Sequence, residues 1–337
     1  MEYLTAFGIG VVTILALIRF YAKVTWKSFK EDVDMTGKTA IVTGANGGLG
    51  KAVAVEFAKR NARVILACRS LIRGEAARME IVADSGCEES NVVLKTLDLS
   101  SFQSVREFAN HVVNNEERLD ILVNNAAIFG KPIIKTKDKM DLTYQTNHFG
   151  PFLLTNLLLD LLKRSGPGSR IINVSSFMHD MCALDLDYLK PDDFGVFCAT
   201  KQTGRWKRKP EILLYNNSKL MNIMFTRELA RRLGDSGVTT NCLSPGIVRT
   251  NILASDKRII VMIVMIFMLV VSKNTKEGCQ TMLHCALSRS LKSVSGKYFT
   301  NCQEDAGVHE VAQDDDACKK LWELSELYTG ICAKPEQ

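Results

Sequence analysis

Tyr215 and Lys219 are the side chains whose types and spacing most directly indicate chemistry. Apolar residues follow at Leu220, Met221, Ile223, Met224 and Phe225, so this segment is predicted to be a buried helix. Residues four positions apart share a helix face, which places the ammonium beside the phenol. A neighbouring positive charge lowers the pKa of a tyrosine from its usual value near 10. The pair is expected to act as a general acid and base on an alcohol or carbonyl. The same spacing also fits a core tyrosine beside a surface lysine, so the rest of the chain must decide.

A glycine-rich segment follows the first predicted strand, residues 38–42, and precedes a helical pattern over 51–60. Glycines permit positive φ and let the backbone approach phosphates closely, and a helix N-terminus attracts a pyrophosphate. The spacing is G-x-x-x-G-x-G rather than the commoner G-x-G-x-x-G. A plain strand-to-helix turn is the alternative. The residues expected to contact a dinucleotide here are Gly44, Ala45, Asn46, Gly47, Gly48, Leu49 and Gly50.

Further apolar strands are predicted at 63–68, 92–96, 119–123 and 170–175, and they alternate with helical patterns. Such alternation predicts an α/β fold with a doubly wound parallel sheet covered on both faces, which is a Rossmann-like architecture. We expect one catalytic domain over residues 36–337.

Arg69 directly follows the second predicted strand. Sites for NAD usually carry an acidic residue at this point, where it contacts the ribose 2′-hydroxyl. A guanidinium instead suits a 2′-phosphate, which it can bind through two hydrogen bonds. The sequence therefore favours NADP(H) as the cofactor, although a solvated surface arginine is the alternative.

The N-terminus, residues 1–23, is apolar up to Ile18 and is followed by basic residues at Arg19, Lys23, Lys27 and Lys30. We interpret it as an uncleaved membrane anchor helix, with the rest of the chain in the cytosol and residues 24–35 as a polar linker. A short buried core helix is the alternative. The net charge of +6 gives no reason to expect nucleic acid. Ten cysteines without Cys-x-x-Cys spacing suit a reducing compartment and indicate no metal site.

Together these features resemble the short-chain dehydrogenase/reductases. Finer motifs are similar to those of the membrane-anchored retinol dehydrogenases of the retinal reductase type. The matching motifs are Ala67-Cys68-Arg69, Asn147-His148-Phe149-Gly150-Pro151, Glu277-Gly278-Cys279-Gln280-Thr281 and Ser295-Gly296-Lys297-Tyr298-Phe299. The resemblance extends over about residues 35–330.

The resemblance implies a catalytic set of Asn147, Ser176, Tyr215 and Lys219. Ser176 would hydrogen-bond the substrate oxygen, and the neighbouring Ser175 is the weaker candidate. Tyr215 would transfer the proton, and Lys219 would hold the nicotinamide ribose and lower the tyrosine pKa. Asn147 would support a proton-relay water.

The resemblance also implies further cofactor contacts. Asp98 would meet the adenine, Asn125 would lie at a cofactor-binding strand end, and Ile247 and Thr250 would fix the nicotinamide carboxamide. One departure is Ala127, where the family usually has glycine. Another is a longer segment between Ser176 and Tyr215 with a basic stretch at 194–210, either lipid-binding or a solvated surface loop.

The expected function is NADP(H)-dependent interconversion of a lipophilic alcohol and its aldehyde or ketone, with retinol and retinal as the favoured pair. Isoprenoid, fatty-aldehyde or steroid substrates are alternatives, as is a catalytically inactive membrane scaffold. The expected location is the endoplasmic reticulum membrane, with the mitochondrial membrane as the alternative. A homo-oligomer is a separate expectation. A substrate lid is expected near 253–275, where the apolar run 259–271 is either a membrane-dipping cover or a core helix.

Overall fold

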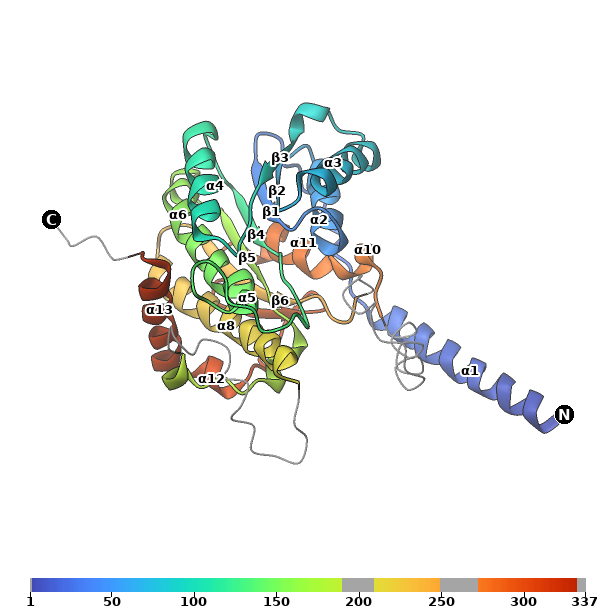
Figure 1. Cartoon of the computed structure of the whole chain (residues 1–337). Coiled ribbons are helices and arrows are strands. Elements are labelled where there is room, and N and C mark those ends of the chain that lie inside the picture. The colour runs from blue at the N-terminus through green and yellow to red at the C-terminus, as the bar shows by residue number, and fades with distance from the viewer. Residues whose placement is uncertain (1, 190–208, 249–271, 332–337) are drawn as a thin grey trace.

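The structure, a computed structural model, describes residues 2–189, 209–248 and 272–331 (Figure 1). Eight strands form one sheet in the order β3-β2-β1-β4-β5-β6-β7-β8. The first seven are parallel, and β8 pairs antiparallel with β7. The strands are β1 (Thr39–Thr43), β2 (Arg63–Cys68), β3 (Val92–Thr96), β4 (Ile121–Asn124), β5 (Arg170–Val174), β6 (Thr239–Ser244), β7 (Tyr298–Thr300) and β8 (Gln303–Glu304).

Helices connect these strands. The longer ones are α1 (Glu2–Thr25), α2 (Gly48–Ala58), α3 (Leu71–Ser85), α4 (Phe102–Asn115), α6 (Gly150–Arg164), α8 (Pro210–Leu233), α11 (Gln280–Leu287) and α13 (Asp315–Thr329). Short helical turns are η1 (Glu89–Asn91), α5 (Leu142–Tyr144), η2 (Gln145–Phe149), η3 (Phe177–Met181), η4 (Leu186–Tyr188), α10 (Thr275–Gly278), η7 (Arg289–Leu291) and α12 (Glu310–Gln313). The predicted α/β fold with a parallel sheet is confirmed, and strand bounds differ by a residue or two.

The sheet has a hydrophobic core on each face, because its central strands are buried between two layers of helices. On one face α2, α3 and α11 bury side chains such as Phe57, Ile81 and Met282. On the other, α4, α6, α8 and α13 bury side chains such as Phe108 and Phe225. Figure 1 shows these two helical layers on opposite sides of the sheet.

The order in which the chain adds strands to the sheet reverses at β1. The strands β2 and β3 extend the sheet on one side of β1, and β4 and the later strands extend it on the other. In open parallel sheets such a reversal leaves a crevice outside the carboxyl ends of the strands, where ligands bind. The predicted cofactor residues and Ser176 follow the carboxyl ends of β1, β2, β3, β4, β5 and β6, so the fold gathers them at one edge of the sheet. Tyr215 and Lys219 lie in α8, and Asn147 lies in η2.

The N-terminal segment forms the helix α1, which projects away from the domain (Figure 1). Within the three described ranges, no helix combines the length and the apolar character needed to cross a membrane. The predicted span is therefore not confirmed. The predicted linker does make specific contacts: the backbone amide of Phe29 donates to Gln280 Oε1 at 3.0 Å, and Glu31 accepts from the backbone amide of Arg289 at 2.9 Å.

Candidate active site

Tyr215 and Lys219 lie on the face of α8 that packs against β5. Pro210 begins this helix at a position where its missing N–H costs nothing. The Lys219 Nζ lies 5.4 Å from the centroid of the Tyr215 ring. It also donates a hydrogen bond to the carbonyl oxygen of Val174 at 2.9 Å, at the end of β5. The four-residue spacing thus brings phenol and ammonium together as predicted.

Ser176 follows β5 directly, and its hydroxyl lies close enough to Tyr215 to lower the pKa of that phenol. The same hydroxyl oxygen accepts from the backbone amide of Met178 at 3.2 Å, which fixes the start of η3. Ser175 points elsewhere, because its hydroxyl donates to the carbonyl oxygen of Lys219 at 2.7 Å. Adjacent residues of an extended chain point in opposite directions. Of the two serines, Ser176 is therefore the one beside the tyrosine hydroxyl.

Burial changes the proton affinities of the pair. It raises the pKa of Tyr215 to about 12, against a smaller lowering by the hydrogen bond to Ser176. Burial also lowers the pKa of Lys219 to about 8. The net pKa of the tyrosine is therefore raised in the protein by itself, and the expectation that Lys219 lowers it stays a prediction. Loss of hydration penalises both charged forms, and the ammonium bonds to Val174 rather than to the phenol. Tyr215 consequently holds its proton at neutral pH.

Asn147 lies in the π-helical turn η2, and its side chain is buried. Its Oδ1 accepts from the backbone amide of Ile128 at 2.8 Å, and its Nδ2 donates to the carbonyl oxygen of Ile128 at 3.0 Å. Nδ2 also donates to Ser218 Oγ at 3.0 Å, and that hydroxyl donates to the Tyr215 carbonyl at 2.7 Å. Asn147 therefore connects the segment after β4 to the helix turn that carries Tyr215. Its role toward a relay water stays a prediction.

The glycine loop has the backbone that its sequence predicts. Gly44 and Gly48 have φ of 67° and 57°, values that favour glycine. A Cβ on Gly50 would lie 2.6 Å from both the Gly44 carbonyl oxygen and the Asn125 amide nitrogen, so this close packing excludes a side chain. Asn125 donates from Nδ2 to the carbonyl oxygen of Thr43 at 2.8 Å. The structure thus places Asn125 as a support of the loop.

The N-terminus of α2 fits a dinucleotide pyrophosphate. Its first residues receive no side-chain cap, and the first turn carries no acidic residue. A Cβ on Gly47 would meet no atom of the described residues within 4 Å, so the space in front of this turn is open. Free amides and the helix dipole at such an end attract an anion. Ala45, Asn46 and Leu49 belong to the same turn.

Arg69 and Asp98 follow the neighbouring strands β2 and β3. Arg69 is exposed and follows β2. Its neighbour Cys68 is buried under the loop, where burial raises the pKa of the thiol to about 11 and the backbone amides of Ala45 and Asn46 hydrogen-bond it. The half-buried Asp98 accepts from the Ser100 amide at 3.0 Å and from the Ser100 hydroxyl at 2.6 Å.

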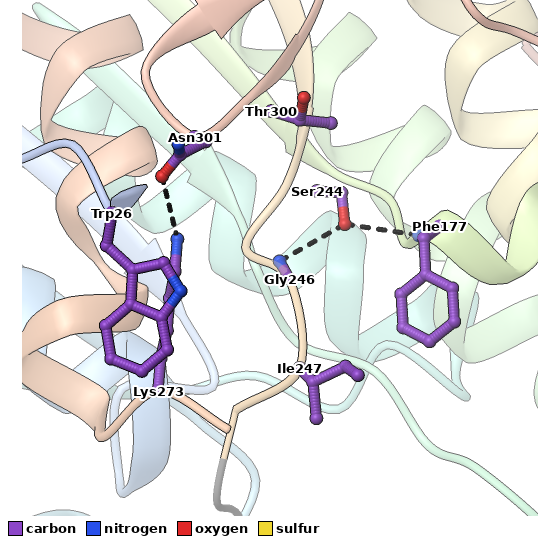
Figure 2. Close-up of a pocket in the computed structure, with 8 residues that line it drawn as sticks. All are labelled: Trp26, Phe177, Ser244, Gly246, Ile247, Lys273, Thr300 and Asn301. Carbon is purple, nitrogen blue, oxygen red and sulfur yellow. Dashed lines mark hydrogen bonds between the residues drawn. The ribbon is translucent and has the colours of Figure 1, made fainter. Parts of the chain in front are cut away.

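The segment after β6 forms the other side of the site. Ser244 Oγ accepts from the backbone amides of Phe177 at 3.1 Å and Gly246 at 3.3 Å (Figure 2). It therefore joins the stretch after Ser176 to the loop that carries Ile247. Ser244 was not predicted from the sequence; a hydroxyl directly before Pro245-Gly246 is the signal that could have found it. Three predicted features fall wholly or partly outside the described residues. They are Thr250, the lid near 253–275 and the basic stretch 194–210.

No cluster of histidine, cysteine or carboxylate side chains in the described ranges could hold a metal ion. The cysteines described there are free thiols, and none forms a disulfide. The chemical groups gathered at this edge of the sheet are hydroxyls, one buried ammonium and backbone amides. Such a set can bind a dinucleotide and transfer a proton to or from an oxygen atom.

Comparison with known proteins agrees with this geometry. Residues 38–184 match the family model for short chain dehydrogenases. Retinol dehydrogenase 14 of Mus musculus is 41% identical over 310 residues, covering 88% of this chain and 87% of that protein. Retinol dehydrogenase 12 of Homo sapiens is 39% identical over 302 residues, covering 90% and 89%. The chain belongs to the short-chain dehydrogenase family.

Solved structures share the fold. A crystal structure of an uncharacterized protein from Mycobacterium Paratuberculosis has a TM-score of 0.66 and 29% identity, covering 88% of this chain and 95% of that one. A protein from Beutenbergia cavernae, described as an NAD(P) dependent gluconate 5-dehydrogenase with bound NADP, has a TM-score of 0.60 and 21% identity. That match covers 80% of this chain and 96% of the other. The protein is thus an oxidoreductase of the short-chain dehydrogenase family, with retinol dehydrogenases among its relatives.

Proposed function

We propose that this protein interconverts a lipophilic alcohol and its aldehyde with NADP(H), and that retinol and retinal are the favoured pair. One observation carries the proposal: Ser176, Tyr215 and Lys219 meet at the end of β5, where the Ser176 hydroxyl lowers the pKa of Tyr215 and Lys219 Nζ lies 5.4 Å from the Tyr215 ring. Similarity to proteins named retinol dehydrogenases, at 39–41% identity over most of the chain, supports the choice of substrate.

The side chains would work as follows during reduction of an aldehyde. A bound nicotinamide cofactor supplies the hydride. Tyr215 holds its proton at neutral pH and donates it to the carbonyl oxygen. The Ser176 hydroxyl gives that oxygen a second hydrogen bond and so stabilises its developing charge. The Lys219 ammonium favours the phenolate that remains. In the direction of oxidation the same tyrosine takes the proton back.

The preference for NADP(H) rests on Arg69. Its exposed guanidinium follows β2, at the edge where the ribose of the adenosine half would lie. A guanidinium binds a phosphate through two charge-assisted hydrogen bonds and gains less from a neutral hydroxyl. NADP(H) is therefore the proposed cofactor.

Attachment to a membrane is proposed through α1. Ile14, Leu17, Tyr21 and Val24 are each more than half exposed and recur at intervals of three and four residues, so they form an apolar stripe along the helix. Such a stripe suits the interface of a lipid bilayer. The basic residues that follow the apolar N-terminus favour a catalytic domain on the cytosolic side, with the endoplasmic reticulum as the proposed membrane.

The test is turnover by the full-length protein in detergent. Retinaldehyde, an isoprenoid aldehyde, a fatty aldehyde and a steroid ketone would each be offered with NADPH and with NADH. Tyr215→Phe should lose roughly 10²–10⁴-fold in kcat while its affinity for NADPH is unchanged. The exposed Tyr21→Phe is the matched control and should behave as the wild type. Near-normal turnover by Tyr215→Phe, or no turnover of any substrate by the wild type, would refute the proposal.

A further inference from the structure

A pocket of about 330 Å³ lies beside the loop after β6 that carries Gly246 and Ile247 (Figure 2). This volume lies within the range of small-molecule sites, roughly 300–1,000 Å³. Its apolar side chains are Trp26, Phe177 and Ile247. The remaining lining residues are Ser244, Gly246, Lys273, Thr300 and Asn301.

The inner wall of the pocket belongs to the active site. Phe177 directly follows Ser176, and Gly246 and Ile247 form the loop after β6. The Ser244 hydroxyl holds these two segments together through its bonds to the Phe177 and Gly246 amides. The pocket wall therefore includes the residue that follows the serine that would bind the reacting oxygen.

The opposite wall comes from the N-terminal segment. Figure 2 shows Trp26 across the pocket from Phe177, with the Gly246–Ile247 loop between them. The indole ring is held by two cations: the Arg19 guanidinium carbon lies 4.9 Å from its centroid, and Lys273 Nζ lies 5.8 Å from it. Both distances are within reach of a cation–π attraction. Trp26 is only half-buried, so part of its surface is available to a ligand.

Asn301 fixes the backbone on both sides of Trp26. Its Nδ2 donates to the Thr25 carbonyl at 2.9 Å, and its Oδ1 accepts from the Lys27 amide at 3.0 Å and from Lys273 Nζ at 3.3 Å. Asn301 and Cys302 form the two-residue turn between β7 and β8, with φ of 47° and 57°. Positive φ at non-glycine residues costs energy and persists where the surroundings impose it. The turn thus presents Asn301 toward the N-terminal segment.

The loop after β6 is connected to the contact between Trp26 and Asn301. Lys273 donates from its backbone amide to the Ile247 carbonyl at 2.8 Å, and its side chain reaches Asn301 and Trp26. The residues that hold Trp26 therefore also hold the loop that would face the cofactor. The N-terminal segment and the catalytic domain meet at this pocket.

We infer that the N-terminal segment completes the substrate-binding site: Trp26 is the outer wall that contacts the apolar body of a long lipophilic substrate, and Asn301 positions it. This inference rests on the proposed function for the class of ligand. A large aromatic ring buries much apolar surface of a chain or polyene at low entropic cost. A short aldehyde bound beside Ser176 does not reach Trp26. The segment that leads to the membrane helix therefore selects substrate length.

The experiment compares retinaldehyde with butanal, using full-length protein in detergent with NADPH. Trp26→Ala should raise KM for retinaldehyde about tenfold and leave kcat/KM for butanal unchanged. Trp26→Phe, which keeps an aromatic ring, should recover most of the loss. Phe20→Ala is the matched control, because Phe20 is an exposed aromatic on α1 outside the pocket.

A binding measurement separates recognition from turnover. Retinol would be titrated into each variant and followed by its own fluorescence, so that the missing tryptophan does not disturb the signal. Trp26→Ala should weaken retinol binding about tenfold. Asn301→Gly keeps a residue suited to positive φ but removes the three hydrogen bonds, and it should weaken binding several-fold. Lys139→Gly is the control, because Lys139 is an exposed residue at positive φ outside the pocket, and it should have little effect.

The outcomes distinguish the two proposals. Retinol binding that depends on Trp26 in a protein that turns over no retinaldehyde would refute the proposed reaction alone. Normal turnover with retinol binding unchanged in both Trp26→Ala and Asn301→Gly would refute the inference alone. Absence of retinol binding by the wild type would overturn both.

Discussion

The charge of Lys219 should control how well the enzyme uses its cofactor above neutral pH. Burial lowers the pKa of this side chain to about 8. A base with that pKa is about 90% charged at pH 7 and about 10% charged at pH 9. If the ammonium holds the nicotinamide ribose, kcat/KM for NADPH should fall about ninefold between these two pH values. Tyr215 does not titrate in this window, because burial raises its pKa to about 12.

The assay is the pH profile of kcat/KM for NADPH from pH 7 to 10, since this ratio reports the ionisation of the free enzyme. Lys219→Arg stays charged throughout, so its profile should be flat at a lower level. Thermal unfolding at each pH controls for loss of folded protein. A flat wild-type profile, or an equal fall in Lys219→Arg, would show that another group titrates and that Lys219 does not act through its charge.

Three further predictions follow from the same structure. Arg69→Ala should raise KM for NADPH and leave KM for NADH nearly unchanged; equal changes for both would mean that Arg69 is structural. Gly50→Ala should lower the melting temperature without cofactor, because its Cβ would lie 2.6 Å from the Gly44 carbonyl, whereas Gly47→Ala, in open space, should weaken only NADPH binding. Titration calorimetry and thermal melts distinguish the two. Burial raises the pKa of Asp141 to about 6, so its contribution to stability is greatest below pH 4 and is lost as the pH rises through 6. Asp141→Asn should therefore stabilise the protein at pH 7 by up to about 3 kcal/mol and have little effect near pH 4, as urea unfolding at both pH values would show.

Local sequence patterns were sufficient for the alternation of the first five strands with helices and for the nature of the loop after β1, whereas β6, β7 and β8 were not predicted. The glycine spacing predicted a tight turn before a helix, and Gly44, Gly48 and Gly50 have the positive φ or close packing that requires glycine. The four-residue spacing likewise placed Tyr215 and Lys219 on one face of α8. These features depend on residues near one another in the chain, so their physical causes can be read from the sequence.

Other features of the site depend on what surrounds each residue, and only the tertiary structure decided them. The pKa of Tyr215 rises because burial removes water, which outweighs the lowering by the Ser176 hydroxyl. Asn125 packs on Thr43, and Asn147 spans from Ile128 to the turn of Tyr215, through contacts across the fold. The predicted linker brings Trp26 to a pocket beside residues more than 150 positions away. Spacing determines which side chains share an element, whereas hydration and partners across the fold determine what those side chains do.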